Sequence, residues 1–386
     1  MSHARAIARI DLAAIESNCA RLRSELAEEV QLCAVVKADG YGHGAIPCAQ
    51  AALAGGARWL AVASLSEALE LEPTSPARLL IMGPLAPEET DIAIGHGFDV
   101  VVWREQFLAL VRERSAKVGK RARIHVKLDS GMGRLGTRDP QEASRIAASA
   151  AADPDVELVG AMTHFATADE RGDAFFQEQL ERFERWIEPI KQAHPDVIAH
   201  AANSAATLRD RRAHFDMVRC GIAIYGMDPF GEDPLAQDLE PALELCSYVA
   251  DVKLCAAGES TGYGRRFIAT ADTHLAVLPI GYGDGWRRAL SNNADVLIQG
   301  RRYPLVGTVS MDSVAVDLGA DPAATELRGA EAVLIGSRGT QRITAEEIAR
   351  RLHSINYEVT CGLTARVQRV AHGLQSSLRE VERSSS

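Results

Sequence analysis

Lys37 is the residue whose type and surroundings most directly suggest chemistry. It follows the apolar run 32–36 (LCAVV) and precedes the glycine-rich segment 38–44 (ADGYGHG). The run is too short for a helix and is typical of a strand buried on both faces. Glycines let a ligand approach the backbone closely. A charge at the carboxyl end of a strand, before such a loop, indicates an active site in an α/β fold, although this position also suits a solvated lysine beside a core strand.

The residues that would accompany Lys37 favour imine chemistry over metal hydrolysis. Because no cluster of histidines and carboxylates stands at metal-ligand spacing, we expect no bound metal. The segment 219–226 (RCGIAIYG) offers backbone N–H groups at Gly221 and Ile222, and Ser204 opens a predicted helix whose N-terminus attracts an anion. A lysine together with a phosphate cradle suggests pyridoxal 5'-phosphate as the cofactor.

Arg219 sharpens this interpretation, because an arginine cannot accept a proton from the ring nitrogen of such a cofactor. At about 4 Å and an effective dielectric constant near 20, its charge would disfavour a protonated ring by roughly 4 kcal/mol, or about three pK units. The ring would then be a weakened electron sink. This suits a reaction that needs only brief carbanion character at Cα.

The elements that must position these residues alternate between strands and helices. Eight strands are predicted at residues 32–36, 59–63, 78–82, 99–103, 123–128, 157–164, 197–203 and 217–222. Helices are predicted between them at residues 45–53, 66–71, 88–96, 105–118, 141–151, 173–194 and 204–211. Eight β/α units predict a (β/α)8 TIM barrel, whose active site lies at the carboxyl ends of the strands.

The residues of the predicted strands that could take part in chemistry or binding fall at or near those ends. They are Lys37, Lys127, Asp129, His164, Asn203, Ser204, Arg219, Gly221 and Ile222. In a barrel they would converge on one mouth. Each also has an ordinary interpretation, because a buried histidine is usually only hydrogen-bonded and a serine can serve only as a helix N-cap.

The last third of the chain has a different pattern and predicts a mostly-β C-terminal domain. Short strands are expected at residues 243–254, 274–280, 295–298, 305–309, 314–318 and 332–335, with a single helix at 344–353 and turns at GYGDG and QGRRYP. The alternating residues 6–10 read as a strand that joins this domain. We therefore expect a barrel at 8–240, a β domain at 241–376 joined by residues 1–7, and a polar tail at 377–386.

Composition narrows the class of protein. The 386 residues carry a net charge of −10 with scattered Lys and Arg, which argues against nucleic acid or an anionic membrane as a partner. No apolar run approaches bilayer length and the start lacks a signal sequence, so we expect a cytoplasmic protein. Seven cysteines without a CxxC pair suit reduced core thiols rather than a zinc site.

Eight motifs in this order resemble the alanine racemase family. They are VVKADGYGHG, KLDSGMGRLG, MTHFATAD, MVRCGIAIYG, TGYGRRF, PIGYGDGW, VSMDS and INYEVTC. The resemblance implies a fold-type III pyridoxal-phosphate enzyme that interconverts L-alanine and D-alanine and supplies D-alanine for peptidoglycan. It also implies a homodimer whose active sites contain residues of both subunits.

The resemblance assigns roles position by position. Lys37 corresponds to the lysine that holds the cofactor as an imine and acts as one base, and Tyr263 corresponds to a second base from the partner subunit. Two bases on opposite faces of a planar carbanion are what racemisation needs. The cofactor-binding positions are Lys37, Tyr41, His164, Asn203, Ser204, Arg219, Gly221, Ile222 and Tyr357. The substrate-carboxylate positions are Arg134 and Met311, with Asp312 beside them. Without the family, Tyr263 and Tyr357 read equally well as amphipathic aromatics in a sheet or interface.

Lys127 corresponds to a position that is often a carbamylated lysine which orients the substrate-binding arginine, here Arg134. Burial lowers the pKa of a lysine, and CO₂ attacks the free amine. The alternative is an ordinary ion pair with a carboxylate such as Asp129.

Four positions depart from the commoner pattern of the family: Cys220, Gly262, Gly283 and Ser310. They leave the breadth of substrates open. The alternatives are therefore a broader amino-acid racemase that accepts serine, a fold-type III decarboxylase, whose glycine-rich phosphate motif we do not find here, and a non-catalytic carrier of the cofactor.

Overall fold

The computed structural model describes residues 4–373, which form two compact units. The barrel unit contains Ile15–Tyr41 and Ala45–Ile224. The β unit contains the chain up to Ala14, residues 42–44 and the chain from Tyr225 onward. These units differ from the expected ranges 8–240 and 241–376, because the early strand and the segment from Tyr225 make their contacts within the β unit. The expected polar tail at 377–386 lies outside the described residues.

The barrel unit is built on a parallel sheet of eight strands in the order β8-β7-β6-β5-β4-β3-β2-β9. The strands are β2 (Gln31–Val35), β3 (Trp59–Val62), β4 (Arg78–Ile81), β5 (Asp99–Val102), β6 (Ala122–Lys127), β7 (Val156–Met162), β8 (Ile198–His200) and β9 (Met217–Cys220). Two hydrogen bonds link the outer strands, since Asp216 N–H donates to Ala199 O and Arg219 N–H donates to Ala202 O. All eight predicted strands and the TIM barrel are confirmed.

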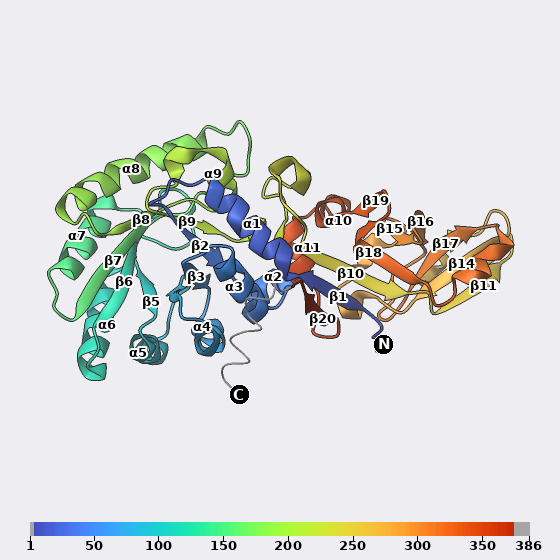
Figure 1. Ribbon diagram of the computed structural model, residues 1–386, viewed down its shortest axis with the longest axis horizontal. Helices are drawn as coiled ribbons and strands as arrows, with labels where there is room; N and C mark the ends of the chain where they lie inside the picture. The colour runs from blue at the N-terminus through green and yellow to red at the C-terminus, as the bar shows by residue number, and fades with distance from the viewer. Residues whose placement is uncertain (1–3, 374–386) are drawn as a thin grey trace. The chain divides into compact units, whose positions relative to one another are not determined.

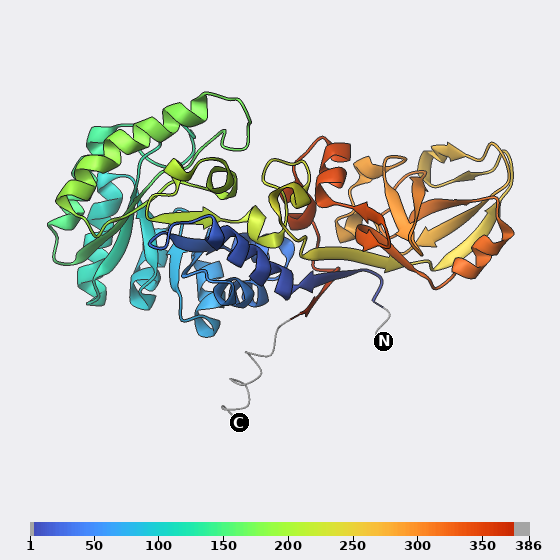
Figure 2. The ribbon, with the colours of Figure 1, turned by 45° about the horizontal axis from the view of Figure 1, so that its top comes forward.

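Helices cover the outside of this barrel (Figures 1 and 2). They are α3 (Ala45–Ala54), α4 (Leu65–Leu71), α5 (Pro87–His96), α6 (Glu105–Val118), α7 (Pro140–Ala151), α8 (Phe175–Ala193) and α9 (Ser204–Arg209). The apolar stripe of α8 is buried as its periodicity predicts, including Phe176, Phe183 and Ile190. A further helix, α1 (Leu12–Ser24), was not predicted, because its small apolar residues give only a weak stripe.

The β unit holds a ten-stranded sheet in the order β11-β14-β17-β16-β15-β18-β10-β1-β20, with β19 paired to β18, and the separate hairpin β12–β13. Its strands are β1 (Ile7–Asp11), β10 (Leu243–Tyr248), β11 (Asp251–Cys255), β12 (Ser260–Thr261), β13 (Phe267–Ile268), β14 (Thr273–Leu278), β15 (Asp295–Ile298), β16 (Arg301–Val306), β17 (Val314–Gly319), β18 (Glu331–Arg338), β19 (Gln341–Ile343) and β20 (Gln368–His372). Two helices, α10 (Ala345–Leu352) and α11 (Asn356–Cys361), accompany them.

Three expectations for this unit need correction. The segment 243–254 is two strands, because the chain leaves the ladder after Tyr248. The expected strand 305–309 begins earlier, at Arg301, since only Gln299 and Gly300 form the turn between β15 and β16. Both turn residues have positive φ, as a two-residue hairpin turn requires. Helix α11 was not predicted. The helix expected at 344–353 is therefore not the only one that the structure describes in this unit.

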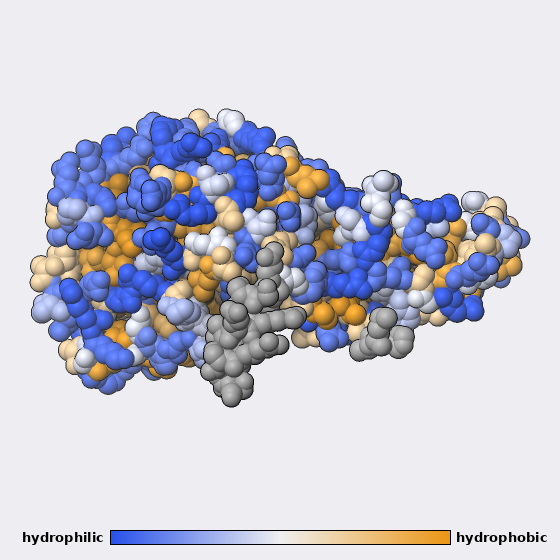
Figure 3. Space-filling view, viewed as in Figure 1, coloured by the Kyte–Doolittle hydropathy of each residue, from blue (hydrophilic) through white to orange (hydrophobic). Residues whose placement is uncertain are grey.

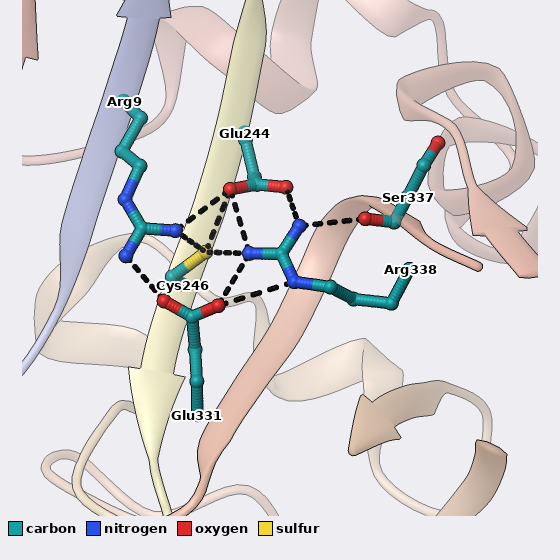
Figure 4. A network of polar contacts seen from close by, with 6 residues as sticks. All are labelled: Arg9, Glu244, Cys246, Glu331, Ser337 and Arg338. Carbon is teal, nitrogen blue, oxygen red and sulfur yellow. Dashed lines mark hydrogen bonds and ion pairs between the residues drawn. The ribbon is translucent and has the colours of Figure 1, made fainter. Parts of the chain in front are cut away.

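An ion-pair network joins β1 to the centre of this sheet (Figure 4). Arg9 of β1 pairs with both Glu244 of β10 and Glu331 of β18, with its Nη1 2.8 Å from Oε2 of Glu244. Arg338 pairs with the same two carboxylates. Since β1 also pairs with β10 and β20, the early strand is a full member of this sheet.

Hydrophilic and hydrophobic side chains are mixed over the face in Figure 3. Among the helices within residues 4–373, none combines the length and the apolar character that a bilayer crossing requires. None of the seven cysteines, all of which lie within residues 4–373, forms a disulfide bond, and all but Cys361 are buried.

Candidate active site

Lys37 lies two residues after the last residue of β2, Val35, at the start of a left-handed turn. Ala38, Asp39 and Tyr41 have φ values of 53°, 51° and 55°, a conformation that costs L-residues roughly 1–2 kcal/mol each. Glu67 holds the start of this turn, because its Oε1 accepts from Ala38 N–H at 2.7 Å. Backbone strain of this kind, fixed by its surroundings, is typical of a functional site.

The hydroxyl of Tyr41 lies against Gly221, at the end of β9. A Cβ atom at Gly221 would come within 2.3 Å of that hydroxyl, so only glycine fits there. The Gly221 N–H donates to Oγ of Ser204 at 3.0 Å. The neighbouring N–H of Ile222 has no hydrogen-bond partner among the residues that the structure describes. These groups form a cradle that can take an anionic oxygen.

Asn203 lies between β8 and α9 and caps the helix. Its Oδ1 accepts from Ala206 N–H at 3.0 Å, so Asn203, not Ser204, is the N-cap of α9. Ser204 is buried as the first residue of the helix and turns its hydroxyl to β9.

Arg219 is buried beside two histidines. Its Nη1 donates to Nδ1 of His200 at 2.8 Å, and its Nη2 lies 3.4 Å from Nδ1 of His164. Backbone oxygens accept its other Nη protons. Within residues 4–373, Nε of Arg219 has no hydrogen-bond partner, and no carboxylate pairs with this guanidinium. Burial lowers the pKa of Arg219 to about 10, which still leaves it charged at neutral pH. Burial and the charge of Arg219 hold the pKa of His164 well below its usual value, so His164 is neutral.

Lys127 is buried at the end of β6, 5% exposed. Burial, followed by the charges of Arg219 and Arg134, lowers the pKa of Lys127 to about 8. The carboxylate of Asp129 is not its partner. It accepts from Gly131 N–H and Gly133 N–H and pairs with Arg138 at 3.4 Å. Among the described residues, no hydrogen bond or ion pair to the Lys127 amine is found, so the expected alternative of a Lys127–Asp129 ion pair is wrong.

Arg134 is exposed on the loop after β6. It lines a hollow of about 370 Å³ with Trp103, Phe107 and Leu135 among others. Its positive charge lowers the pKa of both Lys127 and His164. Arg134 therefore lies near these two residues, at the same mouth of the barrel. The structure thus brings together Lys37, Tyr41, Lys127, Arg134, His164, Ser204, Arg219, Gly221 and Ile222 within the barrel unit.

The other predicted site residues belong to the β unit. Tyr263 stands at the tip of the β12–β13 hairpin with 72% of its surface exposed, and its carbonyl accepts from Oγ1 of Thr308 at 2.7 Å. Met311 is 51% exposed, and its N–H has no partner in the part of the chain that the structure describes. Tyr357 lies in α11 and is half-buried.

Asp312 follows Met311 and is held by two arginines. Its Oδ1 lies 2.6 Å from Nη2 of Arg366 and 3.7 Å from Nη1 of Arg5. Arg366 holds the pKa of Asp312 below its usual value. Asp312 is therefore anionic and fixed by ion pairs, which suits positioning of the loop better than direct binding of a carboxylate.

Comparisons with known proteins agree with this architecture. Residues 10–229 match the family model "Alanine racemase, N-terminal domain", and residues 242–371 match "Alanine racemase, C-terminal domain". The chain belongs to the alanine racemase family. An alanine racemase of Symbiobacterium thermophilum is 40% identical over 95% of this chain and 97% of its own length. Alanine racemase 1 of Bacillus subtilis is 38% identical over 94% of this chain and 92% of its own.

Solved structures of the family have the same fold. The alanine racemase of Streptomyces lavendulae superimposes with a TM-score of 0.91 at 37% identity, over 97% of this chain and 99% of that one. That of Streptomyces coelicolor gives 0.89 at 37% identity, over 96% and 98%. Members of the family are pyridoxal-phosphate-dependent racemases of fold type III, and the chain is one of them.

The barrel site fits this cofactor. The unpartnered N–H of Ile222, the hydroxyl of Ser204 and the close approach of Tyr41 to Gly221 suit a phosphate. The unpartnered Nε of Arg219 suits the lone pair of a pyridine nitrogen. No group of three or more His, Cys, Asp or Glu side chains that could hold a metal ion occurs in residues 4–373.

Sequence reasoning missed several residues of this site. Glu67 forms a capping box with Ser64 at the start of α4, and the spacing S-x-x-E was visible in the sequence. His125 and His200 stand inside apolar strands, where a polar residue signals a buried network. Arg366 carried no such signal, because its partners lie far away in the chain.

Proposed function

We propose that this enzyme interconverts L-alanine and D-alanine at a site centred on Lys37. The observation that carries the proposal is the set of groups gathered at one barrel mouth: a lysine after β2, the Gly221 cradle and the carboxylate-free Arg219. Pyridoxal phosphate, when bound, supplies an imine carbon and a ring that stabilises a carbanion at Cα. We also propose that the enzyme acts in the cytoplasm and that the D-alanine it forms is used for peptidoglycan.

Each barrel residue has a distinct task in this proposal. Lys37 holds the cofactor and moves a proton to or from one face of Cα. The N–H groups of Gly221 and Ile222, with Ser204 and Tyr41, bind the phosphate, and Asn203 supports them as the cap of α9. Arg219 donates from Nε to the ring nitrogen and keeps it unprotonated, with neutral His164 beside it. Arg134, oriented by Lys127, takes the substrate carboxylate.

The residues of the β unit supply the second half of the chemistry. Tyr263 moves a proton on the opposite face of Cα, the N–H of Met311 binds the substrate carboxylate, and Tyr357 contacts the phosphate. We propose that Tyr263 and Met311 serve the site of a second copy of the chain, so that a homodimer completes each active site. The high exposure of both side chains supports the proposal of a shared site, because large apolar groups that are exposed to solvent often mark an interface.

One experiment separates this function from its alternatives. The enzyme is incubated with L-alanine and L-serine in deuterated water, and α-proton exchange, product chirality and CO₂ release are followed together. Racemised, deuterated alanine without CO₂ supports the proposal. Equal turnover of serine would indicate a broader racemase. Release of CO₂ would indicate a decarboxylase, and the absence of α-proton exchange would indicate a non-catalytic carrier of the cofactor.

Mixing two inactive variants tests the shared site. Lys37→Ala removes the base on the barrel and Tyr263→Phe removes the hydroxyl on the hairpin. If the site is shared, mixed dimers contain one site with both intact residues, and activity returns on mixing. Failure to recover activity from mixed dimers that demonstrably form would contradict the shared site.

A further inference from the structure

Three fully buried side chains connect Arg219 to the far side of the barrel interior. Nε2 of His200, which accepts from Arg219 at Nδ1, lies 2.8 Å from Nδ1 of His125. Nε2 of His125 lies 3.3 Å from Oδ1 of Asp99. Asp99, His125 and His200 are each 0% exposed. The chemistry proposed above uses only Arg219 of this chain of contacts.

The direction of every hydrogen bond in this chain is forced. An arginine only donates, so Nδ1 of His200 must accept. Burial and the charge of Arg219 hold the pKa of His200 well below its usual value, so its ring is neutral and its single proton is on Nε2. That proton is donated to Nδ1 of His125, whose own proton is then on Nε2 and faces Asp99.

Asp99 is a firm end point for the chain, because its carboxylate forms ion pairs with two arginines. Oδ1 lies 2.8 Å from Nη2 of Arg78, and Oδ2 lies 2.9 Å from Nη2 of Arg123. An ionised carboxylate only accepts. It therefore fixes the Nε2–H tautomer of His125, and through it that of His200.

The backbone makes room for this arrangement. His125 on β6 stands beside Gly160 on β7, where a Cβ atom would lie 2.2 Å from Nδ1 of the imidazole. The ring of Trp59 also packs against the imidazole, perpendicular to it, with 5.7 Å between the ring centroids. The position of His125 is thus set by packing against both Gly160 and Trp59.

We propose that Asp99, His125 and His200 are positioning residues for Arg219. They fix the tautomer in which His200 accepts from Nη1, so that the guanidinium keeps one orientation and its unpartnered Nε stays available to the cofactor ring. The inference rests on the proposed function of Arg219. If the network served only packing, its loss would change stability but not the electronic state of the cofactor.

The tautomers are measured first, on the apoenzyme and holoenzyme, by ¹⁵N nuclear magnetic resonance of the imidazoles. We expect Nε2–H for both His125 and His200 in both forms. A proton on Nδ1 of His200 would overturn the proposal, because that nitrogen could not then accept from Arg219. This readout does not depend on catalysis, so it stands even if the chain racemises no alanine, a result that would instead contradict the proposed function.

Two variants then disturb the chain in different ways. Asp99→Asn removes the charge at its end, and Gly160→Ala pushes the His125 ring without changing a polar group. Thr90→Val is the control, because Thr90 is equally buried in the barrel unit and its hydroxyl contacts only Ala86 O. We expect kcat for alanine to fall by about tenfold in both test variants, since hydrogen bonds of charged groups are worth about that factor.

The proposal further requires that KM changes much less than kcat and that the visible absorption band of the bound cofactor shifts in both test variants, with neither effect in Thr90→Val. Variants that lose thermal stability but keep the wild-type kcat and absorption band would overturn it. A shift in His125 and His200 tautomers in Asp99→Asn supports it even if that variant is too unstable for kinetics.

Discussion

Nη2 of Arg366 lies 2.6 Å from Oδ1 of Asp312, and Nε of the same guanidinium lies 3.2 Å from Oδ1 of the buried Asp284. Gly283 makes this bridge possible. A Cβ atom at Gly283 would come within 2.3 Å of Nη1 of Arg366. Because Gly283 N–H also donates to Met311 O at 2.9 Å, the turn, the arginine and the Met311 loop are held as one piece.

Gly283→Ala is therefore expected to displace Arg366 and loosen the Met311–Asp312 loop. If Met311 N–H binds the substrate carboxylate, KM for alanine rises severalfold while kcat changes less. Steady-state kinetics measures this, together with amide hydrogen exchange of residues 310–313. Gly95→Ala is the matched control, since a Cβ atom at Gly95 meets nothing within 4 Å. An unchanged KM with unchanged exchange would show that the arginine does not position this loop.

Much of the barrel could be predicted from the sequence, and the reason is physical. Parallel strands buried on both faces are short apolar runs such as residues 32–36, and their polar residues stand at the ends. The β unit was harder. β20 is largely exposed and carries no apolar run, and its place beside β1 is set by pairing across the chain. Apart from its glycines, nothing in the sequence predicts the left-handed turn after Lys37, because Ala38 and Asp39 adopt this conformation only under tertiary constraint.

For the site residues, too, local patterns could be predicted from the sequence and contacts between distant residues could not. Lys37, Arg219 and Gly221 were predicted because each ends or closes a strand. A role as N-cap was considered for Ser204 and not for Asn203, because both are good caps and only the hydroxyl's bond to Gly221 N–H distinguishes them. The ion pairs of Arg366 and Asp312 connect residues more than fifty positions apart, and no local pattern predicts such a contact.

Lys37→Ala is expected to abolish racemisation and the visible absorption of the cofactor imine. The cofactor would lose its covalent attachment but keep its phosphate contacts, so it would be removed by dialysis. Absorbance spectra before and after dialysis, with borohydride treatment of the wild type, measure this. Lys120→Ala serves as a control, because Lys120 is exposed and its amine contacts only Gly95 O. A Lys37→Ala protein that retains the imine band would exclude Lys37 as the attachment site.

Tyr263→Phe is expected to leave α-proton exchange on one face only. Removing the hydroxyl leaves the contact of this residue with Thr308 intact, because the backbone carbonyl of Tyr263 makes that contact. L-alanine and D-alanine in deuterated water would then exchange at very different rates, whereas the wild type exchanges both. Tyr282→Phe is the control, as another exposed tyrosine of the β unit. Full racemase rate in Tyr263→Phe would remove the two-base assignment.

Glu244→Gln should lower stability through the network in Figure 4. Burial raises the pKa of Glu244, but hydrogen bonds from Arg338 and Arg9 outweigh this and leave the pKa lowered. A lowered carboxyl pKa stabilises the fold above the ordinary glutamate value of about 4.3, and this stabilisation is lost as pH falls below it. We expect a loss of about 1–3 kcal/mol at pH 7 and a much smaller difference below pH ~4, measured by denaturant unfolding. Equal losses at both pH values would contradict an electrostatic origin.

Lys127 offers a test of the carbamate. Its pKa of about 8 means that at pH 9 roughly ten amines in eleven are neutral, whereas at pH 7 roughly one in eleven is. Between pH 8 and the ordinary value of 10.5 the folded state binds fewer protons here than the unfolded state, so stability from this group rises with pH. Only the neutral amine attacks CO₂, and the carbamate formed places an anion among Arg134, Arg219 and Lys37.

We therefore expect a carbamate resonance after incubation with ¹³C-bicarbonate, which strengthens as pH rises through about 8. Lys127→Arg should lose this resonance and bind alanine more weakly through Arg134. Lys117→Arg is the control, because Lys117 is exposed and its amine is paired with Asp91 at 2.6 Å. A wild-type spectrum without the resonance at pH 9 would show that Lys127 remains a bare amine.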